Sequence, residues 1–335
     1  MQQFKIGIVG LGPLSQTIHL PCFNDDKNFK IKALCDHNLH LLKPISLKYG
    51  ITKIYTNIDL MIKKEKLDAI ICIVQRPNTF QVSKKILSSN INLLSEKPIS
   101  LKSFEAKRLV KIQRKNKLKF GISYMKRSDD AVQHLKKIHN KKIFGKIISV
   151  NYNSFVGKVK PITKNFIQHK SNLRKKKYSL NKKLIKKKEI FEKYLNTHCH
   201  SVNLIKFIFG NISIKKVNLS KLGEGSVFFE NKKNINIVLK NKYLMDNVLK
   251  EFIYIKYSEG YIKLILQNPF KKKDYSQIII KMKNKKTKIL KFKNWCFQNQ
   301  TSNFANYLKK KKSVLSTAQD GLQDIEIIEK IFKMS

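Results

Sequence analysis

The sequence contains no long hydrophobic run. Its longest purely apolar stretch is Ala69–Val74, whereas a membrane-spanning helix needs about 20 predominantly apolar residues. The first residues, Met1–Lys5, have neither the charged start nor the long apolar stretch of a secretory signal peptide. We therefore expect no membrane segment and a cytoplasmic location.

Cysteine is scarce, and no two cysteines form a Cys-x-x-Cys pair. The five cysteines are odd in number and scattered along the chain, at positions 22, 35, 72, 199 and 296. This pattern argues against a disulfide framework or a zinc cage and predicts free thiols in a reducing compartment. The segment His198-Cys199-His200 offers adjacent ligand types, but neighbouring helical residues point in different directions and no fourth ligand is evident. We expect no metal site.

Arginine and the acidic residues are also few. Only 22 residues are acidic against 70 basic ones, which gives a formal net charge of +48. Of the basic residues, only five are arginine, the residue that nucleic-acid readers favour for bidentate contacts. The 65 lysines are spread over every segment, beside abundant Asn, Ile, Phe and Tyr. This indicates compositional drift toward AT-rich codons, so we expect no specific nucleic-acid binding. A local role for positive charge beside an anionic ligand stays open.

The first residues form an apolar strand, 4–9, that leads into a glycine-rich turn. The turn reads Gly10-Leu-Gly12-Pro13-Leu14-Ser15, a G-x-G-x-x-G pattern with serine in third place. Gly10 would permit the tight turn, Gly12 would let a diphosphate approach the backbone, and Ser15 would keep the next helix close to the strand. A helix over 14–23 would point its N-terminal amides at the phosphates. The pattern predicts a dinucleotide site.

An acidic residue stands where a cofactor ribose would lie. The second strand, 30–35, ends at Asp36, 24 residues after Gly12. A carboxylate at that position would accept a hydrogen bond from the ribose 2′-hydroxyl and would repel a 2′-phosphate. His37 and Asn38 supply no arginine for such a phosphate. The sequence favours NAD over NADP, although a turn aspartate at the end of a strand is the alternative interpretation.

Strands and helices then alternate as in a doubly wound parallel sheet. We expect strands at 54–55, 68–74, 91–95 and 119–123, with helices at 38–49, 57–65, 78–89 and 101–115. Ligands bind at the carboxyl ends of such strands. Pro77 and Asn78 follow one strand, and Glu96 and Lys97 follow another, so these four residues are expected at the cofactor site. Beside a nicotinamide, Lys97 could stabilise a developing alkoxide.

After residue 123 the pattern changes to short β-rich runs. Strands are expected at 147–152, 234–239, 252–257, 261–266, 277–282 and 287–292, followed by helices at 301–311 and 317–333. Several runs alternate apolar and polar residues, which is typical of a largely antiparallel sheet with one buried face. The sequence therefore predicts an α/β protein with a cofactor domain over 1–123 and a substrate domain over 124–335.

One helix in the second half carries the residues suited to proton transfer. A helix from Asn196 to Phe209, ended by Gly210, would place Asn196, His200 and Asn203 on one face. An imidazole titrates near neutral pH, which suits a general base. The alternatives are a structural histidine and, for Asn196, a helix N-cap.

These segments resemble the glucose–fructose oxidoreductase / inositol dehydrogenase (Gfo/Idh/MocA) family over nearly the whole chain. The pieces that carry the resemblance are Gly10-Leu-Gly12, His19-Leu-Pro21, Asp36, Asp68–Ile71 with Pro77-Asn78, Glu96-Lys97-Pro98, Tyr124–Arg127 with Asp129, His200-x-x-Asn203-Leu204 and Ala318–Asp324. The resemblance implies a Rossmann domain, a second α/β domain with an open, mostly antiparallel sheet, and hydride transfer with NAD at a hydroxyl or carbonyl carbon of a sugar, cyclitol or related molecule. It also implies a homodimer or homotetramer built through the open sheets, and a Lys97–Pro98 bond that is often cis.

The resemblance gives each site residue a role and also exposes two departures. Lys97 corresponds to the residue that polarises the reacting oxygen, and His200 to the general base. Asn196 and Asn203 stand where the family commonly has acids, so they would orient the imidazole or the substrate without balancing an imidazolium charge. In a serine protease triad, an Asp-to-Asn change in that role costs about 10⁴ in rate. The chain could therefore act mainly as a reductase, as a catalytically silent NAD sensor, or as an elimination-type glycosidase that recycles NAD.

Two groups of basic residues remain as candidates for substrate contact. Lys126 and Arg127 follow a strand and are expected near the substrate. The segment from Gly157 to Lys193 holds 14 Lys or Arg residues against two acids. This segment is interpreted as a solvated loop, with a cradle for an anionic substrate as the alternative.

Overall fold

The computed structural model describes residues 3–157, 187–245 and 248–335. The chain divides into two compact units, each with its own sheet. The first unit runs from Met1 to Ser123 and also contains Gln300–Leu322, which the expected division assigned to the second domain. The second unit begins at Tyr124 and contains Ile190–Asn299 and Gln323–Ser335.

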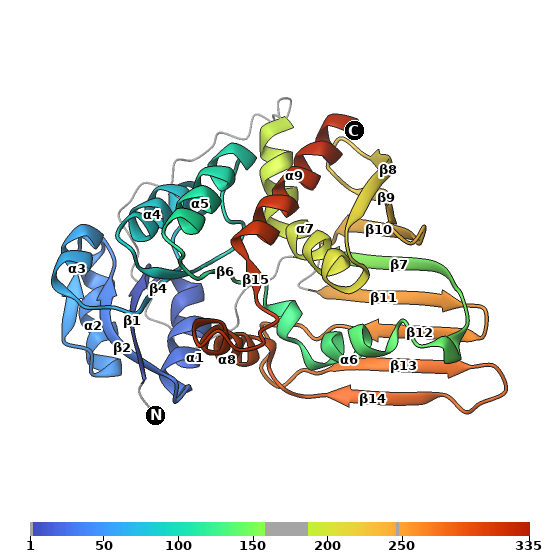
Figure 1. The fold of residues 1–335 in the computed structure, drawn as a ribbon, viewed down its shortest axis with the longest axis horizontal. Coiled ribbons are helices and arrows are strands. Elements are labelled where there is room, and N and C mark those ends of the chain that lie inside the picture. The colour runs from blue at the N-terminus through green and yellow to red at the C-terminus, as the bar shows by residue number, and fades with distance from the viewer. Residues whose placement is uncertain (1–2, 158–186, 246–247) are drawn as a thin grey trace. The chain divides into compact units, whose positions relative to one another are not determined.

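The first unit is built on a seven-stranded sheet with the order β15-β6-β5-β4-β1-β2-β3 (Figure 1). All neighbours are parallel except β15, which pairs antiparallel with β6. Its strands are β1 (Phe4–Val9), β2 (Phe29–Cys35), β3 (Lys53–Tyr55), β4 (Ala69–Cys72), β5 (Asn92–Ser95), β6 (Phe120–Ile122) and β15 (Ser316–Thr317). Because β1 lies between β4 and β2, the chain reverses its direction of winding there, and such a switch point is where ligands bind in open α/β sheets.

Helices separate these strands as expected for a doubly wound sheet. They are α1 (Leu20–Asp25), α2 (Leu39–Tyr49), α3 (Ile58–Lys64), α4 (Arg76–Ser88) and α5 (Ser103–Lys115). Every residue of β4 is buried, since helices cover both faces of a parallel sheet. Asn38 caps α2 by accepting from the His40 N–H at 3.0 Å, and Gly50 ends this helix with φ +63°.

The segment expected to be helical over 14–23 is helical throughout, but it is not a regular α-helix. Pro13 and Leu14 are α-helical, Ser15–His19 forms a π-helical segment, and α1 continues from Leu20. Pro21 has no N–H to donate, so the α-helical hydrogen-bond pattern is interrupted at this point. Short π-helical segments of this kind are common beside functional sites.

A late helix completes the core of the first unit. The helix α8 (Cys296–Leu308) begins five residues before the expected start at 301. From it, Phe304 stacks on Phe29 of β2 with ring centroids 5.9 Å apart, and Phe23 packs edge-on against Phe29 at 4.9 Å. Residues 300–322 therefore belong to the first unit because their apolar side chains fill its core.

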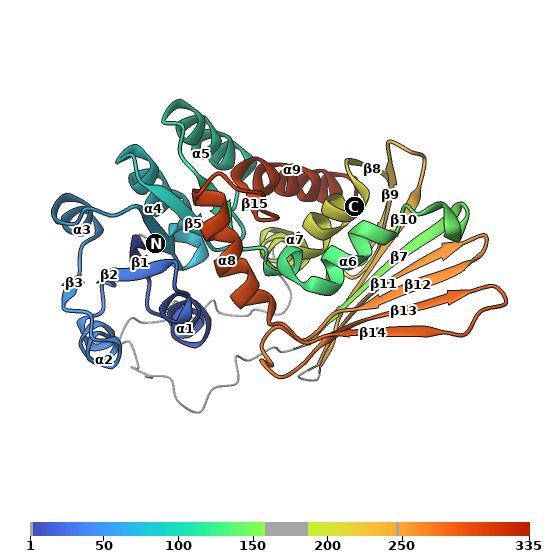
Figure 2. The same cartoon turned by 60° about the horizontal axis from the view of Figure 1, so that its bottom comes forward.

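The second unit contains an eight-stranded sheet with the order β14-β13-β12-β11-β7-β10-β9-β8 (Figure 2). Only β7 and β10 pair in parallel, so the expected mostly antiparallel sheet is confirmed. The strands are β7 (Ile147–Val156), β8 (Ile212–Leu219), β9 (Gly225–Asn231), β10 (Asn236–Tyr243), β11 (Leu249–Tyr257), β12 (Gly260–Ile265), β13 (Ser276–Met282) and β14 (Lys288–Phe292). The strands β8 and β9 were not expected.

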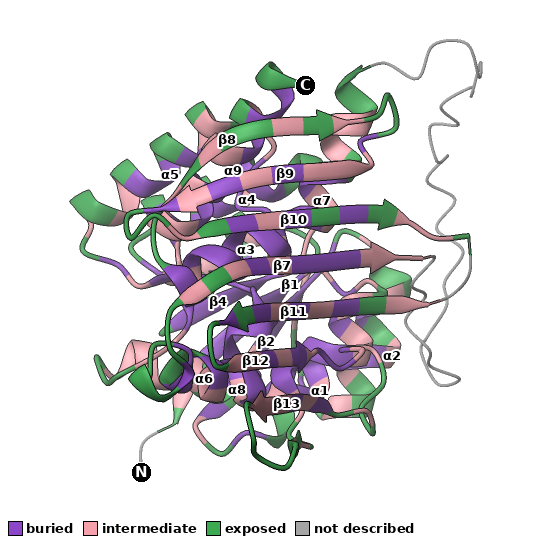
Figure 3. Cartoon of the chain, turned by 90° about the vertical axis from the view of Figure 1, so that its right-hand side faces the viewer, coloured by how far each residue is buried: buried purple, intermediate pink, exposed green. Residues whose placement is uncertain are grey.

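Helices cover one face of this sheet and leave the other open. They include α6 (Asp130–Ile138), which was not expected, and α7 (Lys187–Phe209), while α9 (Ala318–Met334) ends the chain. On β11, alternate residues from Glu251 to Tyr257 are buried beneath the helices, and those between them are half-exposed or exposed. Figure 3 shows the open face, where buried residues alternate with half-exposed and exposed ones along the strands. This period-two burial is typical of a sheet with one covered face.

Candidate functional site

The glycine-rich turn follows β1 at the switch point of the first sheet. Gly10 has φ +91°, and a Cβ atom there would lie 2.3 Å from the Ile73 carbonyl oxygen, so only glycine fits. Its N–H donates to the Cys35 carbonyl at 2.8 Å. A Cβ atom on Gly12, in contrast, would meet no atom within 4 Å. The space above Gly12 is therefore open, as close approach of a diphosphate requires.

The next three residues lead from the turn into the π-helical segment. Pro13 is exposed and Leu14 is half-buried, whereas Ser15 is fully buried. Within the described part of the chain, the Ser15 hydroxyl has no hydrogen-bond partner. The small, buried Ser15 side chain lets the helical segment pack closely, while the space above Gly12 is open. The residues of this turn fit the diphosphate of a dinucleotide.

Asp36 follows β2 and joins that strand to the turn. One carboxylate oxygen accepts from the Leu11 N–H at 2.7 Å and the other from the Asn38 N–H at 2.9 Å. Only 8% of Asp36 is exposed. Each carboxylate oxygen has two lone pairs, so the side chain can still accept a hydroxyl proton donor. Together with burial, Asp36 also raises the pKa of the neighbouring Cys35 thiol to about 12, so this thiol stays protonated.

Glu96 and Lys97 follow β5, and the structure gives Glu96 a partner that sequence reasoning missed. The Glu96 carboxylate lies 2.7 Å from Nε2 of His19, and both side chains are buried. His19 ends the π-helical segment, so this contact fixes the segment that follows the glycine-rich turn to the end of β5. The available signal for this contact was the pair of motifs His19-Leu-Pro21 and Glu96-Lys97-Pro98, which both carry the family resemblance. The Lys97–Pro98 bond is cis, as the resemblance implied.

Pro77 and Asn78 lie at the start of α4, after the loop that follows β4. Both side chains are exposed. The preceding loop residue, Ile73, is the one whose carbonyl oxygen packs against Gly10. The loop between β4 and α4 thus borders the glycine-rich turn.

The helix α7 carries Asn196, His200 and Asn203, three of the residues predicted for the substrate side. It is already helical at Lys187 and ends before Gly210, which has φ +84°. Asn196 therefore lies inside the helix, and the alternative of an N-cap is wrong. Asn196 and His200 are half-buried and stand one turn apart, whereas Asn203 is buried.

Tyr124 packs against the His200 imidazole. The two rings meet edge to face, with centroids 5.5 Å apart and an interplanar angle of 90°. Tyr124 is 3% exposed, and burial raises the pKa of its hydroxyl well above the ordinary value, so it remains protonated. This contact restricts how the His200 ring can turn about its side-chain bonds.

Asn203 is held by a buried charged network within the second unit. Its amide donates to Asp324 at 2.6 Å, and its carbonyl oxygen accepts from Arg127 Nε at 2.6 Å. Asp324 also accepts from Lys206 at 2.9 Å and is fully buried. Burial raises the pKa of Asp324, against the lowering effects of Lys206 and Arg127. The structure therefore places the polar atoms of Asn203 and the Arg127 Nε in contact with protein groups.

Lys126 is likewise engaged within the protein. Its ammonium forms an ion pair with Glu251 of β11, and both residues are buried. Glu251 also accepts from the hydroxyls of Tyr152 and Ser154, each at 3.1 Å. These three donors satisfy a carboxylate that would otherwise be costly to bury.

His198 occupies a fully buried aromatic site on α7. Its ring lies 4.7 Å from the Tyr194 ring and 5.6 Å from the Tyr243 ring. Neither ring nitrogen has a hydrogen-bond partner among the described residues. Burial, followed by the charges of Lys126 and Lys193, lowers the pKa of His198 to about 3. His198 is therefore neutral at physiological pH.

The described residues also bear on metal binding and membrane insertion. No three His, Cys, Asp or Glu side chains gather there as a metal ion would require. Among the helices that the structure describes, none combines the length and apolar character needed to cross a membrane. Most of the lysine-rich segment 157–193, interpreted as a solvated loop with an anion cradle as the alternative, lies outside the described residues.

The geometry of the first unit defines a dinucleotide-binding Rossmann domain. In agreement, residues 4–124 match the family model described as "Oxidoreductase family, NAD-binding Rossmann fold". The matched model is that of the Gfo/Idh/MocA oxidoreductases, the family that the sequence motifs indicated.

Two curated relatives are similar to part of this chain. Oxidoreductase P35 of Formosa agariphila is 21% identical over 143 residues, which cover 43% of this chain and 44% of that protein. D-apiose dehydrogenase of Paraburkholderia graminis is 24% identical over 110 residues, covering 33% of this chain and 29% of that protein. The aligned stretches thus span less than half of these relatives.

A solved structure matches the whole fold. KijD10, a 3-ketoreductase from Actinomadura kijaniata in complex with NADP and TDP-benzene, superposes with a TM-score of 0.77 over 99% of this chain and 98% of that chain. The sequence identity is 11%, so this likeness shows the fold alone. The two-domain α/β architecture predicted from the sequence is confirmed.

Proposed function

We propose that this protein is an NAD-dependent oxidoreductase that transfers a hydride to or from a hydroxyl or carbonyl carbon of a sugar, cyclitol or related molecule. The observation that carries the proposal is the open space above Gly12 in a domain of an NAD-binding oxidoreductase family. A dehydrogenase and a ketoreductase among the similar proteins support the reaction class.

The first unit would hold the cofactor through residues that the chain already positions. The turn from Gly10 to Ser15 would receive the diphosphate, with the N–H groups of the following segment facing its charge. Asp36 would accept from the ribose 2′-hydroxyl and repel a 2′-phosphate, which favours NAD. Pro77 and Asn78 would border the site from α4, and Glu96 would hold Lys97 and the π-helical segment in place. The bound cofactor would supply the hydride acceptor as NAD in oxidation and the hydride donor as NADH in reduction.

The chemistry would use one lysine and one histidine. The Lys97 ammonium would donate to the reacting oxygen and stabilise negative charge that develops there. His200 would accept the hydroxyl proton in oxidation and return it in reduction. Asn196, one turn before His200, would orient the ring or a substrate hydroxyl through its amide. Because Asn196 has no carboxylate, it would not stabilise the His200 imidazolium. The imidazolium would then give up its proton more readily, which favours the direction of ketone reduction.

The substrate would also be bordered by residues whose side chains are fixed within the second unit. Lys126 is held by Glu251, and Arg127 and Asn203 are held in the network with Asp324. We propose that these three residues act by positioning α7 and the substrate wall.

Cofactor binding is the first test. Titration with NADH and with NADPH, followed by the fluorescence of the bound nicotinamide, should show tighter binding of NADH. Asp36→Ala should weaken NADH binding and reduce the preference for NADH over NADPH, because the 2′-hydroxyl loses its acceptor. Equal binding of both cofactors by the parent and by Asp36→Ala would contradict the assigned role of Asp36.

Turnover is the second test. NADH oxidation would be followed with a panel of keto-sugars and keto-cyclitols, and NAD reduction with the corresponding alcohols. His200→Ala should lower kcat by about 10²–10⁴, the usual contribution of a general acid–base group. His40→Ala and Lys111→Ala, at exposed positions of α2 and α5, serve as controls for His200→Ala and Lys97→Ala. Tight NADH binding without turnover of any substrate would leave a sensor as the function.

We also propose a homo-oligomer, dimer or tetramer, in the cytoplasm. The open sheet face carries adjacent half-exposed aromatic rings, among them Tyr254 and Tyr261 with centroids 5.2 Å apart. All five cysteines are free, which suits a reducing compartment. Light scattering of the purified protein tests the assembly, and Tyr254→Glu should shift it toward monomer. A parent protein that is already monomeric at high concentration would refute this part.

A further inference from the structure

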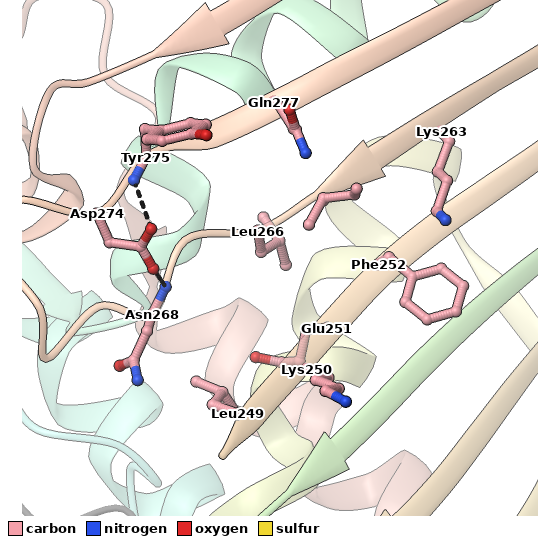
Figure 4. Close-up of a pocket in the computed structure, with 11 residues that line it drawn as sticks. Leu249, Lys250, Glu251, Phe252, Lys263, Leu266, Asn268, Asp274, Tyr275 and Gln277 are labelled. Atoms are coloured by element: carbon pink, nitrogen blue, oxygen red, sulfur yellow. Dashed lines mark hydrogen bonds between the residues drawn. The ribbon is translucent and has the colours of Figure 1, made fainter.

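One pocket of the second unit lies on the open face of its sheet, where β11 begins, β12 ends and β13 begins (Figure 4). It has a volume of about 400 Å³, and side chains such as Phe252 and Gln277 line it. The proposed homo-oligomer would cover this face, so the pocket would meet a second subunit in the assembled protein. The proposed cofactor site belongs to the first unit and uses no residue of that sheet.

An exposed histidine stands directly after the carboxylate that is proposed to select the cofactor. The His37 side chain is 71% exposed, and its Nδ1 lies 3.5 Å from Oδ1 of Asp36. The backbone fixes this carboxylate, because its two oxygens accept from the N–H groups of Leu11 and Asn38. A group that binds to Asp36 would therefore also come near the imidazole.

Other charged and titratable groups lie on the elements next to this end of β2. On α2, on β3 and around α3 they include His40, Lys43, Lys53, Tyr55, Asp59 and Glu65. Asp59 forms an ion pair with Lys85 at 2.6 Å. Glu65 accepts from the Tyr55 hydroxyl at 2.5 Å. Both of these acids are engaged by protein donors, whereas Asp36 is the carboxylate in contact with the imidazole.

The charge of His37 would alter the affinity of this part of the site for a 2′-phosphate. Beside a neutral imidazole, the Asp36 carboxylate would accept from a ribose 2′-hydroxyl and repel a 2′-phosphate. Imidazoles take up a proton as the pH falls from about 8 to about 5. The imidazolium would offset the charge of Asp36 and donate a hydrogen bond to a phosphate oxygen, as arginine does in NADP-binding proteins.

We infer that His37 is a second determinant of cofactor choice, and that its protonation reduces the preference of this protein for NAD over NADP. Protonation would have little effect on NAD itself, because the 2′-hydroxyl carries no charge. The imidazole is exposed, so solvent screens its charge, and the expected change in NADP affinity is about fivefold. This role rests on the proposed function, since it requires a cofactor ribose at Asp36.

Calorimetric titrations of the full-length protein with NAD and with NADP would measure this preference between about pH 5.5 and about pH 8. The oxidised cofactors are used because reduced nicotinamides decompose in acid. In the parent, the ratio of the NADP dissociation constant to the NAD dissociation constant should fall as the pH drops. Part of this fall comes from the 2′-phosphate, which takes up a proton at about pH 6, so variants of His37 are needed to isolate the imidazole.

Two variants of His37 fix its charge at opposite values. His37→Gln cannot become charged, so the fall in the ratio should be about fivefold smaller than in the parent. His37→Arg is permanently charged, so it should strengthen NADP binding about fivefold at about pH 8 and show the same pH dependence as His37→Gln. The matched control is His40→Gln, which removes another exposed imidazole, in the first turn of α2, and should retain the fall seen in the parent.

Three results would overturn this role of His37. An equal fall in the parent and in His37→Gln would show that the phosphate alone causes the pH dependence. Equal effects of His37→Gln and His40→Gln would show a response to general charge instead of the contact with Asp36. No binding of either cofactor to the folded parent would overturn the proposed function as well, whereas the first two results would leave the proposed function intact.

Discussion

Gly10 and Gly12 lie in the same turn, yet alanine should affect a different property at each. At Gly10 it should lower stability, and at Gly12 it should lower cofactor affinity. A Cβ atom at Gly10 would come within 2.3 Å of the Ile73 carbonyl oxygen, on a backbone with φ +91°. The left-handed conformation costs about 1–2 kcal/mol for a non-glycine residue, and overpacking typically adds about 1–3 kcal/mol. Gly10→Ala should therefore lower the free energy of unfolding by about 2–5 kcal/mol.

Gly12→Ala should leave the fold unchanged and remove cofactor affinity. A Cβ atom there would meet no protein atom within 4 Å, and its φ lies outside the left-handed region, so we expect a stability change below about 0.5 kcal/mol. The same methyl group would occupy the space proposed for the diphosphate. An overlap worth about 1–3 kcal/mol corresponds to a loss of NADH affinity of roughly 5- to 150-fold.

Urea unfolding followed by far-UV circular dichroism, with NADH titration of each folded variant, separates the two effects. The reasoning would be refuted if Gly12→Ala bound NADH as tightly as the parent, because the open space would then not be the diphosphate site. It would also be refuted if Gly10→Ala were as stable as the parent, because the contact with Ile73 would then impose no constraint.

Three further predictions concern buried ionisable groups. Asp324→Asn should cost about 3–5 kcal/mol of stability, because it removes the buried ion pair with Lys206. Lys206→Met should cost less stability at about pH 5 than at pH 7, since burial raises the pKa of Asp324 and its carboxyl can then take up a proton. Trp295 fluorescence during urea unfolding follows both variants, and a pH-independent deficit in Lys206→Met would contradict this account. His198 has a pKa lowered to about 3, so below its unfolded value of about 6.5 the unfolded chain binds a proton that the native state does not. Stability should therefore fall by up to about 1.4 kcal/mol per pH unit as the pH drops, and His198→Phe should flatten the profile between about 6.5 and 3; identical profiles for parent and variant would refute the assignment. Glu96→Ala should weaken NADH binding and cost about 1–3 kcal/mol by removing the partner of His19, whereas Glu96→Gln should retain most of both; equal effects of the two changes would show that the hydrogen bond contributes little.

Local signals in the sequence were sufficient to predict the cofactor half of the protein. The glycine-rich turn, the acidic residue after the second strand and the alternation of strands with helices depend on short segments whose geometry follows from residue type. The same holds for the helix that carries Asn196 and His200, since its periodicity and the terminal Gly210 are local features. Its start was placed nine residues late because Asn196 suits an N-cap, although the residues before Asn196 also favour a helix.

Elements without a strong local pattern were missed. The strands β8 and β9 contain several lysine, serine and asparagine residues and pair only with each other and with β10. The helix α6 was also missed; it begins at Asp130, directly after the Tyr124–Arg127 motif and Asp129. Sheet partners decide whether such segments become strands, because β-propensity reflects packing against neighbours more than the backbone itself.

By itself, the sequence determined the Rossmann domain, its family and the residue types at the proposed site. The tertiary structure decided which of these side chains are held by other groups of the protein. Lys126 meets Glu251 across 125 residues, and Asn203 meets Asp324 across 121. It also decided that residues 300–322 return to the first unit. Partners so distant along the chain leave no periodic signal, so only the packed chain shows which charges are paired and which remain available to a ligand.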